Sequence, residues 1–132
     1  GDARGQGYDT DASPIYPASL PYDNVISVAS LMFDGELAAS SNYGAGTVDI
    51  AAPGSYILST APGGGYAFMS GTSMAAPMVT GTAAMIYSFR TDLSLADVKT
   101  AILSSAKPMK SLAGKTVSGG MLDAYAALNY TK

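Results

Sequence analysis

The sequence contains no histidine and no cysteine among its 132 residues. The absence of cysteine excludes disulfide bonds, thiolate metal sites and cysteine nucleophiles. The absence of histidine removes the imidazole that usually takes the proton from a reacting hydroxyl group. A serine hydroxyl of this chain therefore has no histidine within the same 132 residues to act as its base.

Charge is scarce as well. Charged residues make up 13% of the chain, about half the share of a typical soluble domain, and the formal net charge is -3. The sequence has no basic cluster, and it has no run of about 18 apolar residues that could cross a bilayer. We therefore expect neither a nucleic acid nor a membrane as a partner.

Apolar residues, in contrast, make up 48% of the chain, and glycine occurs 15 times. Residues 24–30 are rich in β-branched and apolar side chains on both faces, which predicts a buried parallel strand. Asp34 and Gly35 predict a turn after it. Residues 56–60 and 66–69 predict two short strands, and the glycine-rich residues 61–65 predict the hairpin turn between them.

Helical segments follow these strands along the chain. Residues 73–90 are apolar nearly all round, which predicts a helix that is buried on most sides. Residues 94–97 have a capping-box-like pattern, and a helix that starts there and runs to about Ala106 would place Leu95, Val98 and Ile102 on one face. The alternation of strands and helices predicts an α/β fold.

Residues 69–77 read Met-Ser-Gly-Thr-Ser-Met-Ala-Ala-Pro and join the last expected strand to the long helix. This arrangement places Ser73 at a helix start, where free N–H groups and the helix dipole stabilise negative charge on a substrate oxygen. Pro77 fits the first turn, where its missing N–H has no helical acceptor. The alternative is that Ser73 is only a hydroxyl N-cap of a buried helix.

The same residues resemble the nucleophile signature of the subtilisin-like serine peptidases, G-T-S-M-A-[AST]-P. The resemblance implies that Ser73 is the catalytic serine. One residue departs from the pattern, because the family usually has histidine at the position of Met78. That histidine is not the base of the triad, so the change affects packing more than mechanism.

Other segments resemble motifs of this family in the same order, from about Tyr16 to Leu128. Residues 15–21 resemble its Y-P-A segment, which borders the pocket for the substrate side chain preceding the scissile bond and makes the Tyr16-Pro17 bond a candidate cis peptide. The remaining matches are residues 40–44 (F-S-N-Y-G), 48–54 (V-D-[IVL]-x-A-P-G) and 119–128 (the closing G-x-G-x-[VLI]-[ND]-A-x-x-A). The last match implies a final short helix after a short extended segment.

The resemblance implies that residues 1–132 are the C-terminal fragment of a single catalytic domain. The family carries its triad in the order Asp, His, Ser, so the Asp, the His and the oxyanion Asn are expected upstream of residue 1. The implied fold is an α/β three-layer sandwich with a mostly parallel sheet. Within it, residues 1–23 form a substrate-pocket loop region, 24–70 the strands, and 71–132 the nucleophile helix with the C-terminal helices.

The implied function is part of a serine endopeptidase that hydrolyses peptide bonds of a polypeptide substrate through an acyl-enzyme on Ser73. No cofactor is expected, although a structural calcium ion is left open for the parent protein. The spacing of Asp2, Asp9 and Asp11 does not fit an EF-hand calcium loop. Asp49 is interpreted as a hydrogen-bonded structural carboxylate rather than a cation ligand. We expect a secreted or cell-surface protein of bacterial type, with no signal peptide visible in the chain.

Two other functions stay open at this point: a catalytically dead subtilase-like binding module, and an unrelated α/β domain with a capped helix. We also expect self-association of the isolated chain, because its long apolar helix needs cover that the chain itself does not supply. A dimer is the simplest closed assembly.

Overall fold

The computed structural model describes residues 4–131 of the chain. In chain order, its elements are β1 (Val28–Leu31), β2 (Ile50–Pro53), β3 (Ile57–Ala61), β4 (Gly65–Met69), α1 (Thr72–Phe89), α2 (Leu95–Ser104), β5 (Lys107–Pro108), a 3-10 helix (Lys110–Leu112), β6 (Gly120–Met121) and α3 (Ala124–Leu128).

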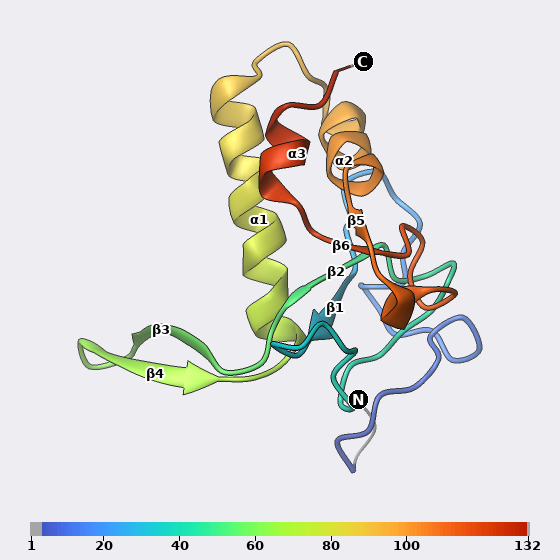
Figure 1. Cartoon of the computed structure of the whole chain (residues 1–132), viewed down its shortest axis with the longest axis vertical. Coiled ribbons are helices and arrows are strands. Elements are labelled where there is room, and N and C mark those ends of the chain that lie inside the picture. Colours follow the sequence, from blue (N-terminus) through green and yellow to red (C-terminus); the bar gives the residue numbers. More distant parts are fainter. Residues whose placement is uncertain (1–3, 132) are drawn as a thin grey trace.

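A mostly parallel sheet in the order β1-β2-β6-β5 forms the centre of the fold. Its β1 and β2 run parallel with Val28 opposite Ile50, β2 and β6 are also parallel, and the short β5 is antiparallel to β6. Helices α1, α2 and α3 pack against one another on one side of this sheet, with α3 lying next to both of the others (Figure 1). The α/β fold with a mostly parallel sheet is therefore confirmed.

The first strand starts later than its sequence predicts. Residues 24–27 are not strand, and β1 begins at Val28. The Val25 N–H donates to Tyr22 O in a turn, and Val25 O accepts a hydrogen bond from the Lys99 ammonium at 2.6 Å. The N–H and the carbonyl of Val25 therefore already have hydrogen-bond partners, and neither group can pair with a neighbouring strand.

Strands β3 and β4 form a hairpin that projects from the body of the protein (Figure 1). Gly63 and Gly64 have φ values of 91° and 84°, which glycine adopts without strain, so the predicted glycine-rich turn is confirmed. The register places Leu58 opposite Phe68, and both side chains are exposed. Few other residues of the described chain therefore cover the hairpin.

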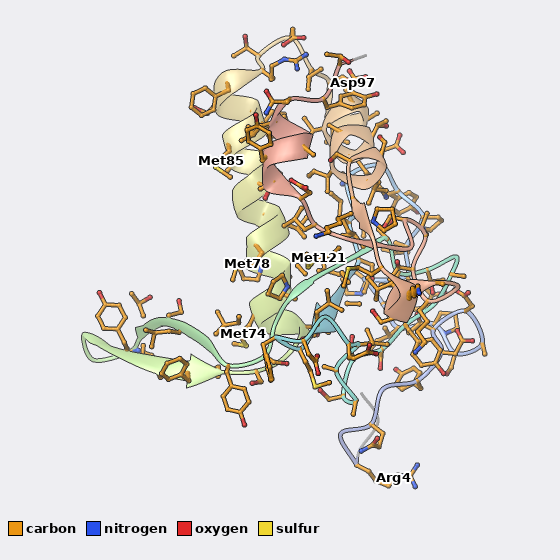
Figure 2. All side chains as sticks on the ribbon, viewed as in Figure 1. Arg4, Met74, Met78, Met85, Asp97 and Met121 are labelled. Atoms are coloured by element: carbon orange, nitrogen blue, oxygen red, sulfur yellow. The ribbon has the colours of Figure 1, made fainter. Side chains whose placement is uncertain are left out.

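Helix α1 is buried on one side only, so the prediction of burial on most sides is wrong for this chain. The sheet and the other two helices cover Ala75, Val79, Thr82 and Ile86, whereas Met78 and Met85, labelled in Figure 2, are exposed. The self-association expected from such apolar exposure stays a prediction. Neither α1 nor any other helix of residues 4–131 is long and apolar enough to cross a membrane.

Helix α2 starts with the predicted capping box. The Ser94 hydroxyl accepts the Asp97 N–H, and the Asp97 carboxylate accepts the Ser94 N–H at 2.9 Å. Val98 and Ile102 are buried as expected, but Leu95 is 46% exposed because it lies in the first turn, beyond the packed part of the helix. The last helix, α3, also follows a short extended segment, as predicted.

Asp49 and Lys99 connect α2 to the start of the sheet. The Asp49 carboxylate accepts the Ser27 N–H at 2.7 Å, and its other oxygen lies 3.4 Å from Lys99 Nζ. The two side chains are 16% and 19% exposed, respectively, and Lys99 Nζ also donates to Val25 O. The interpretation of Asp49 as a structural carboxylate is confirmed.

Asp11 connects the N-terminal loop to residues 44–47 by hydrogen bonds. Its carboxylate accepts hydrogen bonds from the Thr47 hydroxyl at 2.6 Å and from the Gly46 N–H at 3.0 Å, while Asp9 accepts the Asp11 N–H. Asp2, the remaining aspartate of the considered calcium loop, lies outside the described residues. Among residues 4–131, no three histidine, cysteine, aspartate or glutamate side chains gather as a metal site.

Replacing Lys99 by methionine should lower the free energy of unfolding by about 2 kcal/mol, because Asp49 would keep a largely buried charge without its cation. Urea titration followed by circular dichroism measures the loss. The exposed Lys110 offers a matched control, and Lys110→Met should change stability by less than about 0.5 kcal/mol. Equal losses in the two variants would show that the Asp49–Lys99 contact does not stabilise the fold.

Asp11 should make stability depend on pH. The largest influence on the pKa of Asp11 is the hydrogen bond from the Thr47 hydroxyl. Together with weaker hydrogen bonds from the backbone N–H groups of residues 45–47, it outweighs desolvation and lowers this pKa below its ordinary value of 3.8. A lowered folded pKa means that the carboxylate stabilises the fold above the unfolded pKa, and that this contribution is lost as pH falls through the folded pKa.

The Asp11→Asn variant should therefore have a lower Tm than the unmodified chain at pH 7, and the difference should disappear on acidification below the folded pKa. Thermal unfolding across this pH range is the measurement. Asp23→Asn, at an exposed position, is the control and should leave Tm unchanged. A Tm difference that stays constant down to the most acidic sample would contradict the assignment.

Candidate active site

Ser73 is the second residue of α1, not its cap. The N-cap is Gly71, which has no side chain, and its carbonyl accepts the N–H groups of Met74 at 3.0 Å and Ala75 at 3.3 Å. The alternative of a serine hydroxyl N-cap is therefore wrong. The start of α1 has no side-chain cap hydrogen bond, so the Ser73 hydroxyl is not needed to start the helix.

The Ser73 side chain is exposed, and within residues 4–131 its hydroxyl has no hydrogen-bond partner. The N–H groups of Thr72 and Ser73 precede those that bond to Gly71 O, so they belong to the orphan donors of the helix start. Together with the positive end of the helix dipole, they favour a negatively charged oxygen beside Ser73. The site thus combines an accessible hydroxyl with a place for an oxyanion.

The turn that presents Ser73 is held by the segment that follows β2. The Gly71 N–H donates to Gly54 O at 2.7 Å, and the Ser70 hydroxyl accepts the Tyr56 N–H at 2.8 Å. Gly71 has φ 154° and ψ 168°, a region that is essentially restricted to glycine. The pair Ser70-Gly71 just before the helix is typical of a turn. The residues that bind it, 14 and 17 positions earlier in the chain, could not be predicted from the sequence.

A cavity of about 310 Å³ lies beside the turn that presents Ser73. It is lined by the segment 15–19 and by Thr72, the residue before Ser73. The Tyr16-Pro17 peptide bond of this segment is cis, as predicted. The Y-P-A segment and the start of α1, which are far apart in the sequence, therefore border the same cavity.

A second cavity, of about 370 Å³, lies between the β3–β4 hairpin and the start of α1. Ser73 itself lines it, together with Met69 and Met74, and Met74 lies at the base of α1 near the hairpin (Figure 2). Met78, where the resembling family has histidine, also lines this cavity. Thr72 therefore borders the first cavity and Ser73 borders the second.

Comparison with known proteins shows which family shares these features. The subtilase family (peptidase S8) matches residues 4–125. Thermitase of Thermoactinomyces vulgaris is 39% identical over 120 residues, which cover 91% of this chain and 41% of thermitase. Subtilisin-like protease 2 of Plasmodium falciparum (isolate 3D7) is 49% identical over 80 residues, which cover 61% of this chain and 6% of that protein.

Solved structures agree with the sequence comparison. The prenylagaramide maturation protease PagA superposes with a TM-score of 0.75 at 34% identity, covering 86% of this chain and 44% of that one. The A-subunit of the AB5 toxin from E. coli superposes with a TM-score of 0.80 at 29% identity, covering 94% of this chain and 47% of that one. The chain thus spans less than half the length of these relatives. It belongs to the subtilase family of serine peptidases.

Proposed function

We propose that this chain supplies the nucleophile Ser73 to a serine endopeptidase that cleaves peptide bonds through an acyl-enzyme. The observation that carries the proposal is the exposed, unbonded Ser73 hydroxyl at the second position of α1, next to orphan N–H groups. The match to the subtilase family over residues 4–125 supports it. Because the sequence has no histidine, the base of the reaction comes from polypeptide outside these 132 residues.

In the proposed reaction, Ser73 Oγ attacks the carbonyl carbon of the scissile peptide bond while the external histidine takes its proton. The carbonyl oxygen becomes negatively charged and accepts the Ser73 N–H, with an asparagine outside the chain as the second donor. The histidine then protonates the leaving amine, and the acyl group stays on Ser73 Oγ. Water, deprotonated by the same histidine, hydrolyses this ester, and an external aspartate orients the histidine throughout.

The substrate of the proposed enzyme is a polypeptide that lies across Ser73. We assign the side chain that precedes the scissile bond to the cavity bordered by residues 15–19 and Thr72, and the resemblance of residues 15–21 to the family's Y-P-A segment supports this assignment. The chemistry needs no cofactor, because the hydroxyl, the N–H donors and the external base supply every step. We also propose a secreted or cell-surface location for the parent protein.

Replacing Ser73 by alanine in the complete protein should abolish peptidase activity while the protein stays folded, because the nucleophile is gone. A fluorophosphonate should label Ser73 in the unmodified protein, and peptide mass spectrometry locates the label. Ser88→Ala, the same change near the other end of α1, is the matched control and should keep full activity. Labelling elsewhere, or full activity in Ser73→Ala, would refute the assignment of Ser73 as the nucleophile. A complete protein with neither peptidase activity nor labelling would favour the catalytically dead binding module over the enzyme.

The isolated 132-residue chain should not hydrolyse peptides at an enzyme-like rate. Removing triad residues from subtilisin, a member of this family, lowers kcat by about 10⁶-fold, and this chain has no histidine. In the proposed reaction, the second oxyanion donor also comes from outside the chain. Turnover of a chromogenic peptide by the chain and by its Ser73→Ala variant should be indistinguishable. Serine-dependent turnover at ordinary enzyme rates would show that the chain contains its own base.

A further inference from the structure

Gly54 connects the sheet to the nucleophile turn. It follows β2 directly and is buried. Its N–H donates to Leu31 O, at the end of β1, at 3.1 Å, and its carbonyl accepts the Gly71 N–H at 2.7 Å. A single residue therefore links the end of the first strand to the residue that caps α1, which is two positions before Ser73.

The structure leaves no room for a side chain at Gly54. A Cβ atom there would lie 2.3 Å from Ser30 Oγ, 2.7 Å from Gly71 O and 3.0 Å from Ser30 Cβ. Real Cβ atoms essentially never approach other heavy atoms below 3.0 Å, so an added methyl group must displace a neighbour. Gly54 is thus required by close packing rather than by an unusual backbone angle.

An added side chain at Gly54 would push against Ser30 on one side and Gly71 on the other, and a shift of each would have a different effect. Ser30 is fully buried in β1, where its N–H donates to Ser41 Oγ at 2.9 Å and its carbonyl accepts the Ala38 N–H. Gly71 O is the first acceptor of α1 and binds the N–H groups of Met74 and Ala75. A shift of Gly71 would therefore move the first turn of α1, and Ser73 with it.

We propose that Gly54 is a positioning residue for Ser73: its missing side chain sets how closely the nucleophile turn lies against the sheet. The proposal rests on the proposed function, since it concerns the placement of the reacting hydroxyl. Gly54 itself lines neither cavity beside Ser73, so it acts through Gly71 and not through the substrate. Misplacing a reacting group by about 1 Å lowers a rate by as much as about 10²-fold.

The Gly54→Ala variant of the complete peptidase tests the proposal. Active sites are counted by fluorophosphonate titration, so that kcat refers only to folded enzyme. We expect kcat and the rate of Ser73 phosphonylation to fall together by about 10- to 100-fold, with KM changed by less than about twofold. A purely structural role would lower stability but leave kcat per active site unchanged, and that result would overturn the proposal.

Gly65→Ala provides the matched control. Gly65 is the first residue of β4, between Gly54 and Ser73 in the sequence. A Cβ atom there would meet no other atom within 4 Å. This variant should keep the kcat and the phosphonylation rate of the unmodified enzyme. An equal loss in both glycine variants would mean that the effect does not come from packing at Gly54.

The substitution Ser30→Ala tests whether the overlap with Ser30 causes the loss in Gly54→Ala. The Ser30 hydroxyl is buried without a hydrogen-bond partner in the described structure, so Ser30→Ala should leave kcat unchanged. Combined with Gly54→Ala, it removes the closest overlap but leaves the one with Gly71 O. We therefore expect kcat per active site to be highest in Ser30→Ala, intermediate in the double variant and lowest in Gly54→Ala.

Should Gly54→Ala not fold, the comparison of the double variant with Ser30→Ala decides, and equal kcat values would overturn the proposal. A double variant no faster than a folded Gly54→Ala would overturn it as well. The proposed function is judged separately on the unmodified enzyme: absence of Ser73 labelling there refutes the function. Normal labelling there, with equally fast labelling of Gly54→Ala, refutes only the positioning role.

Discussion

The contact between Gly54 and Gly71 is the constraint on which the site depends. The hydrogen bond between these two residues, neither of which has a side chain, brings the start of α1 directly against the end of β2. The helix then continues over β1 and β2, buries Ala75, Val79 and Ile86, and leaves Ser73 at the surface. A buried stripe thus fixes α1 while its second residue, Ser73, stays exposed.

In the proposed peptidase, the chain supplies only part of the site. It holds the Ser73 hydroxyl, the orphan N–H groups of the helix start and two cavities bordered by Thr72 and Ser73, but it has no histidine. The one-sided burial of α1 and the projecting hairpin agree with a body that spans less than half the length of its relatives. The proposed function accordingly divides the catalytic groups between this chain and polypeptide outside it.

Local signals in the sequence predicted much of this arrangement. The capping box of α2, the glycine-rich hairpin turn, and the strand–turn–helix order around Ser73 depend on neighbouring residues, and the structure has all three. The late start of β1 could not be predicted, because Lys99 binds Val25 O across 74 positions. The role of Gly71 as the cap and the tight packing of Gly54 on Ser30 were also missed, since both depend on contacts between distant segments.

The most direct test is a crystal structure of the complete protein inactivated by a peptide phosphonate. Our account predicts a phosphorus atom bonded to Ser73 Oγ, with a phosphonyl oxygen about 2.7–3.1 Å from the Ser73 N–H at the start of α1. It further predicts that a histidine from outside these 132 residues lies within hydrogen-bonding distance of the modified serine. A phosphonate bonded to another residue, or a phosphonyl oxygen turned away from the helix start, would contradict it.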